Sequence, residues 1–336
     1  MKVILYHAHC TDGLFSAYSL WKAFGNDALY IPVNYKPIQD QTPEEALRYI
    51  FNFDLDKNPE IANNSYHYHK KITEADYAGI ELFVVDYSFP VDHFKHHTEV
   101  FNRVLVLDHH HTAFDAYKAI YDHHLDDNGW ANFHTTENSQ VIFSHKESGC
   151  KLAWMFFHKG KVPDYIEYVS DRDLWTFKLK KSEIFHAGVN GLGLKVFSSL
   201  DSHLLYALPK IISVGTVILD DKKRRIQNVK NSSVITVKLV INEEEYSCAL
   251  ANSPPEMASD LCSSVLSDGN HQIAISYYIT KEGKVACSVR SIKTVDSSVF
   301  SLYYGGGGHK QASGCTVDTS VFFASVEEKL WRINYG

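Results

Sequence analysis

Residues 104–111 have the sequence VLVLDHHH, in which a short apolar run ends in one aspartate and three histidines. The run of Val and Leu predicts a buried β-strand. Open α/β sheets bind their ligands at the carboxyl ends of such strands. Carboxylate oxygens and imidazole nitrogens are ligands of Mn, Fe, Co and Zn, so the polar end of this run is a candidate metal site. The alternative is a strand followed by a solvated polar turn.

Other apolar runs end in a similar way. Residues 3–6 (VILY) lead into a polar turn that contains Asp12, and residues 82–85 (LFVV) end at Asp86. A further polar cluster, residues 170–173 (SDRD), ends a predicted helix. Singly, each is typical of a turn or a helix cap. Together they predict that carboxylates and imidazoles from several strands meet above one sheet, which is what a two-metal centre needs.

The order of the predicted elements indicates an α/β fold. Strands alternate with segments of helical spacing over residues 1–181, which predicts a doubly wound, mainly parallel sheet. Residues 182–230 are expected to form a helical connector. Residues 231–336 are expected to form a smaller C-terminal α/β domain, with a hairpin made by strands 273–278 and 285–290.

Three local expectations complete this outline. Pro32, within the run 30–33, predicts an edge strand, because proline cannot donate a hydrogen bond to a neighbouring strand. Residues 54–75 and 115–146 are polar and are expected to be irregular.

Composition narrows the class of protein. The chain has 336 residues, of which 45% are hydrophobic and 22% charged, as in ordinary globular proteins. No apolar run approaches the ~18 residues that span a bilayer, and no signal-peptide cleavage region follows the N-terminus, so we expect a cytoplasmic protein without a membrane partner.

The six cysteines form no CxxC pair, which argues against a zinc ribbon or a disulfide framework. The net charge of −7 disfavours binding to long duplex DNA. The sequence leaves the oligomeric state open.

Residues 305–314 (GGGGHKQASG) form another motif. Glycines let backbone N–H groups approach an anion closely, and His309 and Lys310 add positive charge. The spacing of a Walker A loop is absent. Arg290, at the end of a predicted strand, is a further candidate for phosphate contact. The motif predicts an anion-binding loop, with a flexible linker as the alternative.

Together these motifs resemble those of the DHH–DHHA1 phosphoesterase family, relatives of the RecJ-type exonucleases and of the nanoRNase/pAp phosphatases. The residues that carry the resemblance are Asp12-Gly13, Asp86, Asp108-His109-His110, Ser170-Asp171, and Gly306-Gly307-Gly308-His309 through Gly314. They have the order and separation of the family motifs and extend over nearly the whole chain. The segments 7–13 and 170–175 are most similar to a branch often labelled exopolyphosphatase-like.

The resemblance implies a binuclear site for two divalent cations, with Mn²⁺ as the expected ion. Asp86 would bridge the two ions. The coordination of the second ion would be completed by Asp12, His109 and Asp171. Asp108 would orient His109, a role that carboxylates often have toward metal-bound imidazoles.

The same resemblance assigns catalysis and substrate binding. His110 would contact the scissile phosphate. The substrate's other phosphate or its nucleotide would be held by Gly306, Gly307, Gly308, His309 and Arg290.

The chain departs from the family at Cys10, where the family usually has an aspartate. His7, His9 or Cys10 could supply the missing ligand, and an imidazole or thiolate would favour Fe²⁺, Co²⁺ or Zn²⁺ over Mn²⁺. Asp173 is an alternative to Asp171.

The sequence thus predicts a metal-dependent hydrolase of phosphodiester or phosphomonoester bonds. Its expected substrates are short phosphorylated nucleotides: short oligonucleotides, linear or cyclic dinucleotides, or 3′-phosphoadenosine 5′-phosphate (pAp). One alternative is an exopolyphosphatase or pyrophosphatase, which needs the same metals. Another is a catalytically inactive nucleotide-binding homologue, for which Cys10 is the main support.

Overall fold

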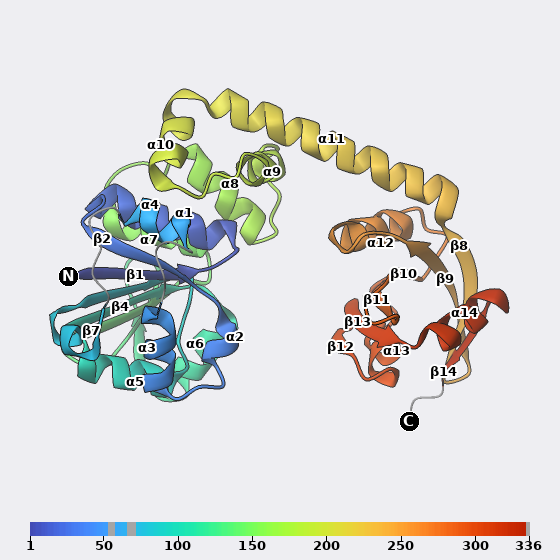
Figure 1. The fold of residues 1–336 in the computed structure, drawn as a ribbon, viewed down its shortest axis with the longest axis horizontal. Helices are drawn as coiled ribbons and strands as arrows, with labels where there is room; N and C mark the ends of the chain where they lie inside the picture. The colour runs from blue at the N-terminus through green and yellow to red at the C-terminus, as the bar shows by residue number, and fades with distance from the viewer. Residues whose placement is uncertain (53–57, 66–71, 334–336) are drawn as a thin grey trace. The chain divides into compact units, whose positions relative to one another are not determined.

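The computed structural model describes residues 1–52, 58–65 and 72–333. Its packing divides the chain into two units, Met1–Ile218 and Leu219–Gly336 (Figure 1). Each unit is a mixed α/β structure with its own sheet and its own buried apolar core. The expectation of an α/β chain with two sheets is therefore confirmed.

In the described part of the chain, the sheet of the first unit has seven strands in the order β2-β1-β3-β4-β7-β6-β5. These strands are β1 (Lys2–His7), β2 (Ala28–Val33), β3 (Glu81–Val85), β4 (Arg103–Asp108), β5 (His123–Leu125), β6 (Ala131–Phe133) and β7 (Ser139–Phe143). Strands β2, β1, β3, β4 and β7 pair in parallel, and β6 and β5 extend the sheet as antiparallel strands. The edge position of β2 confirms the expectation drawn from Pro32.

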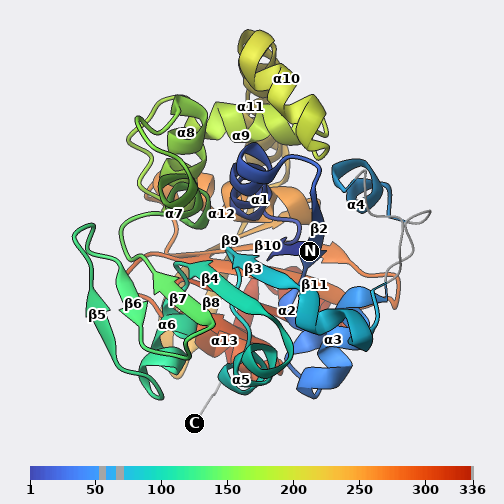
Figure 2. The same cartoon turned by 90° about the vertical axis from the view of Figure 1, so that its left-hand side faces the viewer.

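Helices cover both faces of this sheet (Figure 2). The described helices of this unit up to α10 are α1 (Thr11–Phe24), α2 (Tyr35–Ile38), α3 (Pro43–Phe51), α4 (Pro59–Asn64), the 3-10 helix η1 (Glu74–Gly79), α5 (Val91–Val100), α6 (His111–Lys118), α7 (Gly149–Phe157), α8 (Asp164–Asp173), α9 (Ser182–Gly191) and α10 (Phe197–Tyr206). Helix α8 packs on α1 and α7 rather than on the sheet. Successive strand residues point to opposite faces, so Val84 packs in the core on the side of α3 and α5, whereas Phe83 and Val85 pack on the side of α1 and α7. Burial on both faces explains why the central strands are continuous apolar runs in the sequence.

The strand order reverses at β1. The chain passes from β1 to β2 on one side and then to β3 on the other side of β1. In open α/β sheets, ligands bind in the crevice outside the carboxyl ends of the strands at such a reversal. His7 ends β1 and Asp86 directly follows β3, so both residues lie at this crevice.

The two segments expected to be irregular contain regular structure. Residues 115–146 include β5, β6 and β7, and β7 pairs in parallel with β4, so the expectation was wrong there. Strands of three and five residues with polar flanks give little periodic signal. Residues 54–75 include α4, while 54–57 and 66–71 lie outside the described residues.

The segment 182–230 is helical, as α9, α10 and α11 (Leu208–Ser233). Side chains of α9 and α10, among them Phe185 and Phe197, are buried in the core that contains α1, so both helices belong to the first unit. Within the described residues, no single helix is long and apolar enough to cross a bilayer. The pair α10 and α11, which is bent by 97° at its junction, reaches the length and apolar composition of a membrane span when the two helices are taken together.

In the described residues of the second unit, the sheet has the order β12-β13-β11-β10-β9-β8-β14. Its elements are β8 (Ile235–Ile241), β9 (Glu244–Asn252), the 3-10 helix η2 (Pro255–Met257), α12 (Ala258–Ser267), β10 (Ile273–Ile279), β11 (Val285–Ser291), α13 (Ser298–Tyr303), β12 (Gly307–His309), β13 (Ala312–Val317), α14 (Thr319–Glu327) and β14 (Leu330–Ile333). The predicted hairpin is confirmed, because β10 and β11 pair antiparallel. Leu261 of α12 packs on one face, and Phe300 of α13 and Phe322 of α14 pack on the other.

Candidate metal centre

His, Cys and Asp side chains converge at the carboxyl ends of β1, β3 and β4 and at the ends of α1 and α8 that face them. They form three groups, and within each group the potential ligand atoms lie within 4.8 Å of one another. The groups are His7, Cys10 and Asp86; Asp12, His109 and Asp173; and Asp86, Asp108, His109 and His110. Asp86 and His109 each belong to two groups, so the three groups form one cluster, which we call the ligand cluster.

Asp86 lies at the middle of the ligand cluster, in the turn after β3. Its backbone has a φ of 54°, in the left-handed region that aspartate tolerates better than most residues. Its Oδ1 lies 3.1 Å from Nε2 of His109, and its Oδ2 lies 3.7 Å from Nδ1 of His7. Burial would raise the pKa of Asp86, but the two histidines lower it below its ordinary value. The two oxygens face different groups of ligands, an arrangement suited to a bridging carboxylate.

Two glycines allow helices to approach these strand ends closely. A Cβ atom on Gly149, the first residue of α7, would lie 2.6 Å from both Cβ and Oδ1 of Asp86. A Cβ atom on Gly13 in α1 would lie 2.2 Å from the carbonyl oxygen of His7. The N-termini of α1 and α7 thus lie against the ligand cluster, where their positive dipole ends favour carboxylates.

Asp12, in the first turn of α1, is 1% exposed. Its Oδ1 accepts hydrogen bonds from Oγ of Ser148 at 2.8 Å and from the backbone N–H of Cys150 at 3.1 Å. Its Oδ2 lies 3.6 Å from Nε2 of His109. Burial and the neighbouring carboxylates raise the pKa of Asp12, so an ionised Asp12 carries a cost that a nearby cation would relieve.

His109 lies where the carboxylates meet. Its Nε2 is 3.1 Å from Oδ1 of Asp86, 3.6 Å from Oδ2 of Asp12 and 3.5 Å from Oδ2 of Asp173. Burial lowers the pKa of His109, but the hydrogen bond to Asp86 and the surrounding negative charges outweigh burial and raise it to about 10. Without a metal, the protonated ring supplies the positive charge among these carboxylates. A divalent ion that displaced this proton would find the same oxygen ligands.

The ligand cluster fits a divalent cation. Oδ2 of Asp12, Oδ2 of Asp86 and Nδ1 of His7 are buried and have no hydrogen-bond partner among the described residues. Buried polar atoms are normally paired, so three such atoms in one cluster indicate a missing ligand. Carboxylates and imidazoles are ligands of Mn, Fe, Co and Zn. Cys10 adds a thiol whose pKa is raised by burial and by Asp86, so a metal would have to displace its proton.

Asp108 has a different environment. Its Oδ2 accepts a hydrogen bond from Oγ of Ser88 at 2.6 Å. Its Oδ1 lies 2.7 Å from Nδ1 of His110 and accepts the backbone N–H of His109, also at 2.7 Å. The sequence-based expectation that Asp108 orients the ring of His109 therefore needs correction: the ring it holds is that of His110. Burial lowers the pKa of His110, but the bond to Asp108 raises it overall.

The structure does not bring Asp171 into the ligand cluster. Its carboxylate accepts hydrogen bonds from the backbone N–H groups of Lys178 and Leu179, at 2.8 and 3.0 Å, and from the hydroxyl of Thr176. Asp171 thus holds the loop after α8, and Asp173 is the carboxylate that joins the cluster. Residues two apart on a helix point about 200° apart, so only one of the two can face the sheet.

His9 is also outside the ligand cluster. It is exposed, has a φ of 56° and lines a separate pocket of the first unit. Of the three candidates for the missing ligand, His7 and Cys10 form a group with Asp86, and His9 does not.

The predicted substrate-binding residues of the second unit lie around the β12–β13 hairpin. A Cβ atom on Gly306 would lie 2.2 Å from the carbonyl oxygen of Gly314, and one on Gly308 would lie 2.6 Å from that of Ala312. Close backbone approach therefore accounts for these two glycines, whereas Gly307 has open space around it.

The two cationic candidates of the second unit lie near this hairpin. His309, at the end of β12, is exposed. Arg290 of β11 pairs in register with Ala312, and its guanidinium donates to the carbonyl of Val289 at 2.9 Å and to Oγ of Ser259 at 3.4 Å.

Comparisons with known proteins give a distant relative and a shared fold. No protein-family model matches the chain. An uncharacterized protein of Acanthamoeba polyphaga mimivirus, R106, is 24% identical over 329 residues, which are 94% of this chain and 67% of that protein. The chain shares the fold of PggH, a pGpG-specific phosphodiesterase from Vibrio cholerae, with a TM-score of 0.53, 13% identity and coverage of 97% and 96% of the two chains. An exopolyphosphatase-related protein from Bacteroides fragilis is more distant, with a TM-score of 0.38, 12% identity and coverage of 98% and 90%.

Proposed function

We propose that this chain is a metal-dependent phosphoesterase that hydrolyses phosphodiester or phosphomonoester bonds of short nucleotide substrates. The observation that carries the proposal is Asp86, whose two oxygens face separate groups of ligands while Oδ2 has no hydrogen-bond partner among the described residues. Membership of the DHH–DHHA1 family belongs to the same proposal. The shared fold with a pGpG-specific phosphodiesterase is compatible with it.

Two divalent cations would be held in the ligand cluster, with Asp86 between them. His7 and Cys10 would complete one site. Asp12, His109 and Asp173 would complete the other. Mn²⁺ is the first candidate, and the imidazole and thiol at residues 7 and 10 favour Fe²⁺, Co²⁺ or Zn²⁺ as alternatives. When bound, such ions supply Lewis-acid stabilisation of negative charge on phosphate oxygens.

The pair Asp108 and His110 would act on the phosphate ester. Asp108 holds Nδ1 of His110, which leaves Nε2 on the far side of the ring to face the substrate. Because the pKa of His110 is raised, the ring keeps its proton to a higher pH than a free histidine does. A protonated Nε2 can donate a hydrogen bond to a phosphate oxygen and a proton to the departing oxygen.

The second unit would bind another part of the substrate through Gly306, Gly307, Gly308, His309 and Arg290. The open surroundings of Gly307 and the exposed ring of His309 support this role. A short substrate agrees with the net charge of −7, which opposes binding along a nucleic acid backbone.

The test is hydrolysis by the purified full chain with Mn²⁺ of a labelled dinucleotide, a pentanucleotide, a cyclic dinucleotide, pAp and polyphosphate. We expect mononucleotides or AMP to be released, and Asp86→Asn to abolish the release. Phosphate from polyphosphate alone would overturn the substrate class. Absence of turnover with each of Mn²⁺, Co²⁺, Fe²⁺ and Zn²⁺ would overturn the enzymatic function and favour an inactive homologue.

A further inference from the structure

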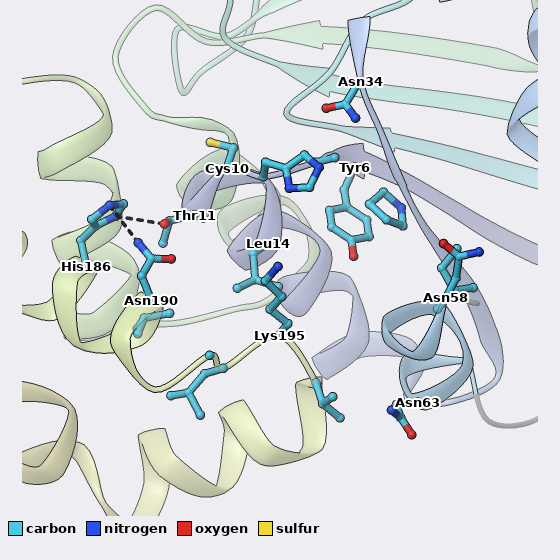
Figure 3. Close-up of a pocket in the computed structure, with 18 residues that line it drawn as sticks. Tyr6, Cys10, Thr11, Leu14, Asn34, Asn58, Asn63, His186, Asn190 and Lys195 are labelled. Carbon is cyan, nitrogen blue, oxygen red and sulfur yellow. Dashed lines mark hydrogen bonds between the residues drawn. The ribbon is translucent and has the colours of Figure 1, made fainter. Parts of the chain in front are cut away.

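A second site adjoins the ligand cluster in the first unit. It is a pocket of about 870 Å³, shown in Figure 3, and this volume is in the range of small-molecule sites. Cys10 and Thr11, at the start of α1, form part of its wall. Cys10 also belongs to the ligand cluster, as does Asp12, the residue after Thr11. The first turn of α1 therefore separates the pocket from the candidate metal positions.

The pocket has an apolar floor and a polar rim. Tyr6, Leu14, Val189 and Leu194 are buried lining residues and supply the floor. The rim carries carboxamide groups, several of which surround Tyr6 and Leu14 in Figure 3: Asn34, Asn58, Asn63 and Asn190. A carboxamide offers a donor and an acceptor side by side, which is also the pattern along the edge of a nucleobase.

The charge of the lining differs from that of the whole chain. The chain has 40 Asp and Glu against 33 Lys and Arg, yet none of the described lining residues is acidic. The lining has one ammonium group, that of Lys195, and two imidazoles, those of His9 and His186. The lining thus favours a ligand with an apolar body and negative charge.

Hydrogen bonds within the protein hold two walls of the pocket in place before a ligand binds. Nδ1 of His186 lies 2.9 Å from Oγ1 of Thr11, and its Nε2 lies 3.0 Å from Nδ2 of Asn190, as the dashed lines in Figure 3 show. On another side, the carboxamide of Asn64 donates to the carbonyl of Lys195 at 3.0 Å and accepts the backbone N–H of Phe197 at 2.7 Å. A preformed wall lowers the ordering cost of binding.

We propose that this pocket binds the nucleoside part of the substrate while the adjoining phosphate lies at the ligand cluster. This inference rests on the proposed function and assigns the place where the base of its nucleotide substrate would bind. The flat faces of a base suit the apolar floor and its polar edges suit the carboxamides, while the ammonium group of Lys195 attracts a negatively charged ligand. A polyphosphate chain has no apolar face and would leave the floor uncovered.

The experiment measures binding of adenosine and guanosine 5′-monophosphate, with ribose 5-phosphate as a base-free probe, to the full chain with Mn²⁺ by titration calorimetry. Chromatography confirms that the nucleotides stay intact. We expect at least one nucleotide to bind about tenfold more tightly than ribose 5-phosphate, since contacts to the base add to those of the phosphate. Asn190→Trp, which fills the pocket, should remove that difference. Lys195→Glu, which replaces a positive by a negative charge, should weaken the binding of the nucleotides and of ribose 5-phosphate alike.

Two matched variants control for bulk and charge. Glu183→Trp places the same side chain on α9 at an exposed position outside the pocket lining. Lys210→Glu makes the same charge change at an exposed position of α11, also outside the lining. Both should retain the preference for the nucleotide, and circular dichroism checks that every variant folds.

The outcomes separate this inference from the proposed function. Equal affinity for nucleotide and ribose 5-phosphate, or unchanged affinity in Asn190→Trp and Lys195→Glu, would overturn the pocket's role even if the chain hydrolyses nucleotides. A base-dependent affinity that Asn190→Trp loses would support the pocket even if no substrate is hydrolysed.

Discussion

Asp86 and Asp108 follow or end neighbouring parallel strands and are almost fully buried, at 1% and 0% exposed, yet their surroundings differ. Both oxygens of Asp108 accept hydrogen bonds from the protein, from Ser88 and from the His109–His110 segment. Oδ2 of Asp86 accepts none from the described residues. Burial therefore does not distinguish the proposed metal ligand Asp86 from the proposed positioning residue Asp108. The number of protein donors around each carboxylate does distinguish them.

The largest expected effect is the difference between the isosteric variants at these two positions. Asp86→Asn should lose metal at both sites and lower turnover by about 10³-fold, because the charge that holds and positions the ions is gone. Asp108→Asn should retain metal and lower turnover by only about 10–100-fold, as a positioning residue does. Metal content by elemental analysis and steady-state rates check both. Equal metal loss in the two variants would contradict the distinction.

A smaller effect is expected from a methyl group placed against Asp86. Gly149→Ala should weaken metal affinity by about 10–100-fold, because the added Cβ displaces Asp86 from its position. Gly79→Ala is the matched control, since nothing lies within 4 Å of a Cβ there. Metal titration of both variants is the measurement. Wild-type affinity in Gly149→Ala would show that Asp86 can shift without loss.

Stability of the metal-free chain should change in opposite directions at two carboxylates. Asp12→Asn should raise the free energy of unfolding by on the order of 1 kcal/mol at neutral pH, because a carboxylate with a raised pKa is ionised at a cost that the carboxamide avoids. Asp108→Asn should lower it by about 1–3 kcal/mol, because a neutral carboxamide weakens the charge-assisted hydrogen bonds from Ser88 and His110. Urea unfolding in the presence of a chelator measures both. Destabilisation by Asp12→Asn would contradict the electrostatic account of the ligand cluster.

The prediction with the smallest effect tests whether an unpaired buried polar atom is sufficient to identify a metal ligand. Both ring nitrogens of His97 lack partners among the described residues. Its neighbours are the rings of Phe89, Phe101, His93 and His96, and no carboxylate joins them in a candidate metal group of the described residues. Burial lowers the pKa of His97 well below 6.5, so it stays neutral in the folded chain and gains a proton only on unfolding. Because only the unfolded chain binds this proton, the free energy of unfolding falls as the pH drops below 6.5, by about 1 kcal/mol between pH 6.5 and 5.5. Above pH 6.5 this loss is absent.

His97→Phe should remove that part of the pH dependence, as measured by urea unfolding at pH 5.5 and pH 7.5. It should leave metal content unchanged. If the free energy of unfolding of His97→Phe depends on pH as that of the wild type does, or if the variant loses metal, this interpretation of His97 is contradicted.

The sequence was sufficient to predict which side chains meet where those side chains directly follow buried strands. Asp12, Asp86 and His109 were predicted to meet because parallel strands and their following helices bring such positions to one edge, and the structure brings them together. The choice between Asp171 and Asp173 depends on the rotation of α8, which two polar residues on one helix do not reveal.

Other features were beyond the sequence because they depend on contacts between distant segments. Ser88 and Ser148 are common turn residues until their carboxylate partners are known. Strand β7 pairs with β4, β6 pairs with β7 and β5 pairs with β6, while their own polar flanks hide them in the sequence. Gly306, Gly307 and Gly308 were predicted for anion contact, but close backbone approach within the hairpin also requires glycine at 306 and 308.

The fit of Gly149 against Asp86 has a consequence for how this chain can evolve. The two residues come from separate segments, yet a larger residue 149 would collide with both Cβ and the carboxylate of Asp86. Because every residue except glycine carries a Cβ atom, this constraint on residue 149 remains even where residue 86 is no longer a carboxylate. Loss of the carboxylate alone therefore leaves Gly149 constrained, and a side chain at position 149 would signal that the backbone around residue 86 has moved.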